Sequence, residues 1–238
     1  FKLIYNHSMK SQDPNQEHLQ SIINLYTEGQ LQQALSESSQ MLERFPNSVI
    51  LYNIAGASNA ALMQFDAAID SYKQALKIKP DYADAYFNMG IAIKDKDDLE
   101  AAIDSYKQAI KIKPDYAEAY NNMGSALKDK GDLQEAIDSY RQALKIKPNY
   151  ADAYNNMGNA LKDKEDSEAA IDSYKQAIKI KPDYAEAYIN MGIAMKEKDD
   201  LEAAIDSYKQ ALRIKPDYAE AYINMGNALK DKDDLEAA

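Results

Sequence analysis

Proline recurs along this sequence at a constant interval of 34 residues. After an isolated Pro14, the prolines stand at Pro46, Pro80, Pro114, Pro148, Pro182 and Pro216. Glycine follows the same interval, at Gly56, Gly90, Gly124, Gly158, Gly192 and Gly226. A fixed period of this length is typical of a repeat array, in which stacked units bury a core that one unit alone does not complete.

The prolines divide the 238-residue chain into consecutive units. Five units are complete, and they occupy 49–82, 83–116, 117–150, 151–184 and 185–218. A diverged unit, 15–48, is expected to cap the array, and a truncated seventh unit occupies 219–238. Residues 1–14 carry no repeat signature, so we expect an irregular N-terminal segment there or, for residues 1–8, a cloning remnant.

The spacing within one unit predicts two antiparallel helices. Apolar and small residues recur at intervals of three and four between Ala119 and Leu127, which places them on one helical face. Gly131 and Asp132 then supply a left-handed C-cap for this helix and an N-cap for the next. Pro148 ends the second helix, because a ring without an N–H cannot continue it.

The turns carry two further local predictions. An Asn or Asp followed three residues later by an acid predicts a capping box at the start of a unit, at Asp115/Glu118, Asn149/Asp152, Asp183/Glu186 and Asp217/Glu220. Where one unit has Gly131, the others have Met63, Asp97, Glu165, Asp199 and Asp233. We expect the acidic residues among these to adopt a left-handed conformation, whereas the sequence offers no account of Met63.

Composition argues against several classes of function. The chain has 28 Lys and Arg against 39 Asp and Glu, and its formal charge of −11 disfavours binding to DNA or RNA. The chain has no cysteine and only His7 and His18, so we expect no metal site, no cofactor and no catalytic centre. No apolar run approaches the roughly 20 residues that span a bilayer, and no signal peptide is apparent. We therefore expect no membrane contact and a cytoplasmic location.

The residue pattern of these units resembles the tetratricopeptide-repeat (TPR) family. In the unit 83–116 the family positions are filled by Tyr86, Met89, Gly90, Ile93, Ala102, Tyr106, Ala109 and Pro114. The resemblance covers 49–238 closely and 15–48 loosely. It implies an all-α fold, an α-solenoid in which antiparallel helix hairpins form a right-handed superhelix. We expect the small residues to stand where two helix backbones approach closely, with the tyrosines beside them.

Three periodic features have both a functional and a structural interpretation. The columns containing Tyr120, Tyr140 and Tyr150 are either a base-stacking platform or packing residues. The column that begins at Met89 is either an adaptable binding surface or core. Acidic turns such as 95–98 are either a metal site or solvated loops. We favour the structural interpretation of all three. The acidic chain argues against base stacking on the tyrosines, and each methionine precedes the close-packing glycine. The acidic turns lack the ligand order of a calcium loop.

One asparagine recurs in the first helix of successive units. These residues, here called the ladder, are Asn88, Asn122, Asn156, Asn190 and Asn224. In the TPR family the first helices line a concave wall, and the resemblance is strongest to the repeat lobe of O-GlcNAc transferases, where such a ladder grips polypeptide. A carboxamide offers one acceptor and two donors, which match a peptide bond. The structural alternative is a tolerated polar residue that makes structural hydrogen bonds.

Two neighbouring columns complete the predicted binding surface. The position before the ladder contributes Phe87, Asn121, Asn155, Ile189 and Ile223, and the position three residues after it contributes Ile91, Asn159 and Ile193. We expect a non-catalytic scaffold that binds extended or disordered protein segments, neutral to basic, in its groove. The alternatives are the substrate-recruitment lobe of a larger, glycosyltransferase-like enzyme and a module that self-associates head to tail through an uncapped C-terminal end. A consensus-designed array is a further alternative, against which the irregular unit 15–48 argues.

Overall fold

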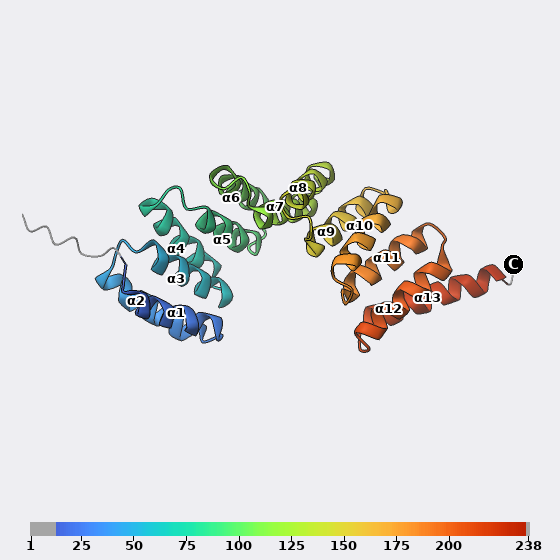
Figure 1. Ribbon diagram of the computed structural model, residues 1–238, viewed down its shortest axis with the longest axis horizontal. Coiled ribbons are helices and arrows are strands. Elements are labelled where there is room, and N and C mark those ends of the chain that lie inside the picture. Colours follow the sequence, from blue (N-terminus) through green and yellow to red (C-terminus); the bar gives the residue numbers. More distant parts are fainter. Residues whose placement is uncertain (1–12, 237–238) are drawn as a thin grey trace, which may run out of the picture. The chain divides into compact units, whose positions relative to one another are not determined.

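The computed structural model describes residues 13–236, over which it contains helices and no strand (Figure 1). The helices are α1 (Gln16–Thr27), α2 (Leu31–Arg44), α3 (Val49–Ala61), α4 (Phe65–Ile78), α5 (Ala83–Lys94), α6 (Leu99–Ile112), α7 (Ala117–Lys130), α8 (Leu133–Ile146), α9 (Ala151–Asp163), α10 (Ser167–Ile180), α11 (Ala185–Glu197), α12 (Leu201–Ile214) and α13 (Ala219–Glu236). Odd-numbered helices from α3 onward begin the predicted repeats, and even-numbered helices complete them.

The described helices form two compact units, of which one ends at Pro114 and the other begins at Asp115. Within each unit, consecutive helices pack against each other as antiparallel hairpins (Figure 1). Helices two apart in the chain also touch, as α3 does with α5 and α9 with α11. Each hairpin therefore buries its apolar face against its neighbours, and the predicted all-α solenoid is confirmed.

In the hairpins from α3/α4 to α11/α12, the centre is a tyrosine from the second helix, packed on a glycine of the first. Tyr72, Tyr106, Tyr140, Tyr174 and Tyr208 are all at most 2% exposed. A Cβ placed on Gly124 would lie 2.7 Å from Cε1 of Tyr140, and one on Gly56 would lie 2.5 Å from Cε1 of Tyr72. The glycine column is therefore small because a tyrosine ring occupies that space, rather than because two backbones meet there.

The turns inside the hairpins adopt the predicted left-handed conformation at most positions. Gly131 has φ 93°, and Asp97, Glu165, Asp199 and Met63 have φ between 60° and 65°. Asp233 does not follow them, because α13 continues as a helix to Glu236. The prediction for Asp233 was wrong: the described chain provides no following helix that would fold back onto α13.

The capping boxes predicted at the starts of α7, α9 and α11 do not form. The N-cap residues of α7, α9 and α11 are Tyr116, Tyr150 and Tyr184, and none of them makes a side-chain capping bond. Asn149 and its equivalents lie one residue too early for the box. The tyrosine is held at the N-cap by tertiary packing: Tyr150 contacts the cluster around Leu144, and the Lys147 ammonium lies 4.4 Å from its ring centroid.

Candidate functional site

The ladder asparagines lie on the first helices of five successive hairpins. Asn88 lies on α5 in the first compact unit, and α7, α9, α11 and α13 of the second unit carry Asn122, Asn156, Asn190 and Asn224. All five residues are partly exposed. Their amides therefore reach solvent while part of each side chain lies against the helix surface.

Three of the ladder residues are tied to the preceding repeat by an amide–amide hydrogen bond. Nδ2 of Asn88 donates to Oδ1 of Asn53 at 3.2 Å. In the same way, Nδ2 of Asn156 donates to Oδ1 of Asn121 at 3.1 Å, and Nδ2 of Asn190 donates to Oδ1 of Asn155 at 3.1 Å. Each acceptor belongs to the column immediately before the ladder, one repeat earlier. These bonds use one N–H of the ladder amide and leave its other N–H and its oxygen outside the pair.

Residues of the column before the ladder are mostly buried between helices. Asn121 is 6% exposed, and Asn155 and Ile189 are each 1% exposed. Phe87 is half-buried, and its ring centroid lies 6.1 Å from that of Tyr106. Asn121, Asn155 and Ile189 therefore offer almost no surface to a ligand, although the sequence pattern grouped them with the groove.

The column three residues after the ladder contacts the core tyrosines. The Tyr140 hydroxyl donates to Oγ of Ser125 at 3.2 Å, and the Tyr174 hydroxyl donates to Oδ1 of Asn159 at 2.8 Å. Burial raises the pKa of Tyr140 to about 12, although its hydrogen bond with Ser125 acts in the opposite direction. Asn159 thus supports the core as well as facing solvent in part.

Where this column holds Ile193, the side chain offers no acceptor to Tyr208, the tyrosine of the same hairpin. Ile193 is half-buried and packs against the cluster that contains Tyr208. The Tyr208 hydroxyl is buried, and among the described residues it has no hydrogen-bond partner. Ile91, the other predicted isoleucine, is likewise half-buried.

Charged residues at the ends of the first helices form ion pairs between repeats. In the second unit, Lys128 lies 3.6 Å from Asp163, and Lys196 lies 2.8 Å from Asp231, each 35 residues further along the chain. Within one repeat, Lys147 lies 3.0 Å from Glu118. Much of the charge beside the ladder is therefore already paired.

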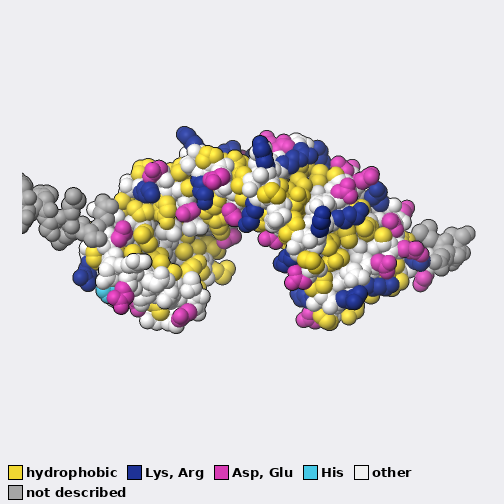
Figure 2. Space-filling view, in the orientation of Figure 1, with side chains coloured by type: hydrophobic (Ala, Val, Ile, Leu, Met, Phe, Trp, Pro, Cys, Tyr) yellow, Lys and Arg dark blue, Asp and Glu magenta, His cyan; other side chains and the backbone are white. Residues whose placement is uncertain are grey.

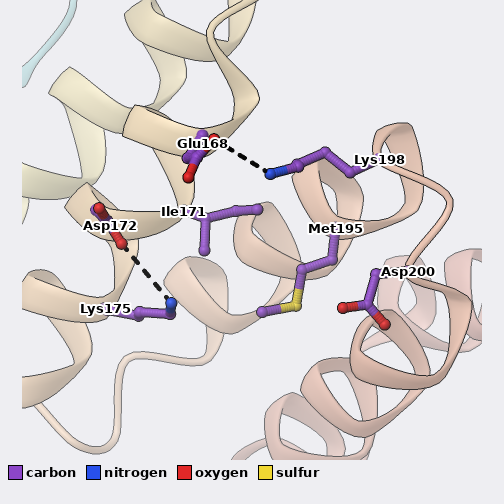
Figure 3. Close-up of a pocket in the computed structure, with 7 residues that line it drawn as sticks. All are labelled: Glu168, Ile171, Asp172, Lys175, Met195, Lys198 and Asp200. Carbon is purple, nitrogen blue, oxygen red and sulfur yellow. Dashed lines mark ion pairs between the residues drawn. The ribbon is translucent and has the colours of Figure 1, made fainter.

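A second surface feature, which the sequence reasoning missed, is a cavity between successive hairpins. One such cavity, of about 340 Å³, lies in the second unit. Figure 3 shows its lining, where Ile171 and Met195 lie among charged side chains. Lys198 lies 3.5 Å from Glu168, and Lys175 lies 3.7 Å from Asp172.

The same cavity recurs in the first unit, with a volume of about 750 Å³ and Ile69 and Ile93 among its lining residues. There Asp66 pairs with Lys96, as Glu168 does with Lys198. An acid and a lysine 30 residues apart are the sequence signal that marks these cavities. Their lining contains no ladder residue.

Charged side chains of both signs are interspersed over the visible face in Figure 2, without a region of one sign. Within residues 13–236, no group of three or more His, Cys, Asp or Glu residues could hold a metal ion. Over the same part of the chain, every helix is too short or too polar to cross a membrane.

Known proteins share both the repeat and the fold. The sequence profile of the TPR repeat matches residues 61–97, 92–131, 124–164, 158–199 and 195–233. The crystal structure of MamA is 31% identical and superposes with a TM-score of 0.64 over 69% of this chain and 96% of MamA. YrrB, a TPR protein with an unusual peptide-binding site, shares the fold at 20% identity, with a TM-score of 0.63 over 78% of this chain and 95% of YrrB.

A probable UDP-N-acetylglucosamine–peptide N-acetylglucosaminyltransferase of Arabidopsis thaliana, SEC, is 36% identical over 74 residues. That segment is 31% of this chain and only 8% of the plant enzyme. The profile matches, by contrast, cover most of the chain, and MamA is matched over nearly its whole length. This chain therefore belongs to the tetratricopeptide-repeat family, whose arrays are protein–protein interaction scaffolds and generally have no catalytic activity.

Proposed function

We propose that this chain binds extended polypeptide segments along the ladder, and that the carboxamides hold the main chain of the bound segment. The observation that carries the proposal is that the ladder amides are partly exposed and, in three repeats, held by a single hydrogen bond. Such an amide keeps an acceptor and a donor, which match the N–H and C=O of a peptide bond. Contacts of this kind accept many side-chain sequences.

Two of the related proteins support this proposal. YrrB, which shares the fold, has a peptide-binding site. The Arabidopsis relative is an enzyme that modifies peptides. The half-buried side chains of Phe87, Ile91 and Ile193 would supply apolar contacts beside the ladder. The net charge of −11 favours neutral or basic segments.

The test is a titration of a library of unstructured, lysine-containing peptides against the parent protein and a variant with Asn122→Ala, Asn156→Ala and Asn190→Ala. One net hydrogen bond contributes about 0.5–1.5 kcal/mol, so loss of three is expected to weaken binding by at least about tenfold. The matched control carries Gln108→Ala, Gln142→Ala and Gln210→Ala, because these glutamines are exposed on second helices. Equal affinity of the folded ladder variant and the parent would refute the proposal.

The likeness to the plant enzyme favours a second candidate, a substrate-recruiting segment of a larger glycosyltransferase-like protein. Peptide binding would then serve a catalytic domain encoded by the same gene. Sequencing the gene downstream of the codon for Ala238 tests this candidate, which requires a catalytic domain in the same reading frame.

Head-to-tail self-association and the cytoplasmic location both stay predictions. The side chains of α13 that such an assembly would use include Tyr222, Ile223 and Leu229, which are 52%, 64% and 43% exposed. Sedimentation velocity over a hundredfold range of protein concentration separates a monomeric binder from an assembling module.

A further inference from the structure

The buried asparagines behind the ladder form a second layer of amides. Asn121 accepts a hydrogen bond from Nδ2 of Asn156 at 3.1 Å, and its own Nδ2 donates to Oδ1 of Asn122 at 3.3 Å. It therefore links two successive ladder residues through one side chain that is 6% exposed. Asn155 accepts from Asn190 in the same way and is 1% exposed.

An exposed asparagine amide is free to rotate, because its terminal torsion has broad and roughly two-fold wells. A buried carbonyl oxygen left without a donor is costly, so Asn155 favours the rotamer of Asn190 in which an N–H faces inward. The oxygen of Asn190 and its second N–H are then held toward the surface. Holding the amide before a ligand arrives removes part of the ordering cost of binding.

From this arrangement we infer that Asn53, Asn121 and Asn155 are positioning residues, which orient the ladder amides Asn88, Asn156 and Asn190 for a bound main chain. The inference rests on the proposed function and adds to it which donor and acceptor groups each ladder residue presents to the bound main chain. Asn156 and Asn190 present an oxygen and one N–H. Asn122, whose oxygen already accepts from Asn121, presents mainly its N–H groups.

The next repeat provides a natural comparison for Asn155, in the column before the ladder. Ile189 occupies the position of Asn155 one repeat later and is equally buried. It has no acceptor for Asn224, the ladder residue of the following repeat. Asn224 therefore receives no amide acceptor from this column, unlike Asn156 and Asn190. Because the fold already holds isoleucine here, Asn155→Ile is a matched substitution that is expected to leave the hairpins folded.

The first experiment needs no peptide and follows the side-chain amide signals of Asn190 by ¹⁵N-edited NMR. In the parent protein, one of its two N–H protons is expected to exchange slowly with solvent. Asn155→Ile should abolish that protection, whereas Asn121→Ile should leave Asn190 unchanged and alter Asn156. Unchanged Asn190 signals in the folded Asn155→Ile variant would overturn the inference.

The second experiment is a double-mutant cycle with Asn155→Ile and Asn190→Ala, which uses the tightest-binding member of the peptide library. Asn155→Ile is expected to weaken binding by roughly threefold to tenfold in the parent and to have no further effect beside Asn190→Ala. An equal loss in both backgrounds would assign Asn155 a structural role and overturn the inference. If no peptide binds any of these proteins, the proposed function fails, and the NMR result alone decides whether Asn155 positions Asn190.

Discussion

Whether the hydroxyl group of a core tyrosine has a hydrogen-bond acceptor depends on the residue 15 positions earlier in the chain. Tyr174 and Tyr208 occupy the same place in successive repeats, and both are fully buried. The Tyr174 hydroxyl donates to Asn159, whereas Ile193 stands at the corresponding position before Tyr208. One hydroxyl therefore stabilises its hairpin, and the other is a desolvated polar group that has no partner within residues 13–236.

This difference predicts opposite responses to the same substitution. Tyr174→Phe is expected to lower the free energy of unfolding by about 1 kcal/mol, because it removes a hydrogen bond. Tyr208→Phe is expected to be neutral or stabilising, since it removes a buried hydroxyl that has no partner. Urea unfolding monitored by circular dichroism measures both. Equal losses in the two variants would contradict this account.

Tyrosine burial also predicts how the protein responds to alkali. Burial raises the pKa values of Tyr140 and Tyr208 to about 12, from the ordinary value of 10.0. Their contribution to stability is complete below pH 10. It is lost as the pH rises through 12, because the unfolded chain gives up these protons first.

We therefore expect the core tyrosines to ionise only as the helices unfold. Tyrosinate absorbance and helical circular dichroism, recorded together against pH, check this. Complete ionisation near pH 10 with the helices intact would show that the rings are accessible.

At the scale of helices, the glycine column decides how closely a first helix lies on the second helix of its hairpin. Gly124 has the Tyr140 ring against it, with Cε1 2.7 Å from the site of a Cβ. Gly226, on α13, has nothing within 4 Å of that site. Glycine is thus required by packing on α7, whereas on α13 the described structure leaves room for a Cβ.

Gly124→Ala and Gly226→Ala form a matched pair that tests this distinction. The first is expected to destabilise by roughly 1–3 kcal/mol, because the buried ring of Tyr140 must move. The second is expected to stabilise by about 0.5–1 kcal/mol through the higher helix propensity of alanine. Urea titration of both variants measures the difference, and a change of the same sign in both would refute the packing argument.

At the scale of the whole chain, a repeat array distributes stability among neighbouring hairpins. The helix α11 packs against α12 and buries Ile189 and Met191. Its counterpart α13 leaves Ile223 64% exposed and, among the described residues, has no second helix of its own hairpin.

Local unfolding should therefore be easier at α13 than at α11. Hydrogen exchange with mass-spectrometric detection is expected to show faster exchange of the α13 amides, because fewer buried contacts oppose their opening. Peptides from α11 in the same digest serve as the internal reference. Equal protection of the two helices would contradict the nearest-neighbour description of stability.

The all-α solenoid of helical hairpins could be predicted from the sequence. The 34-residue interval of proline and glycine, and the spacing of small and aromatic residues, are local signals that specify a helical hairpin. Left-handed turns at Asp97 and Asp199 could also be predicted, because Gly131 marks the same position in another repeat.

Only the tertiary structure decided which residues beside the ladder are accessible. Asn121 and Asn155 immediately precede ladder residues in their helices. Helix spacing alone does not show which of the two adjacent asparagines is buried. Asn121 and Asn155 are buried because the next hairpin covers them, and the amide oxygen of each accepts a hydrogen bond from an asparagine 35 residues further along. The capping boxes failed for the same reason, since Tyr150 packs on the preceding hairpin and moves the helix start by one residue. Contacts between repeats lie outside the reach of a local pattern.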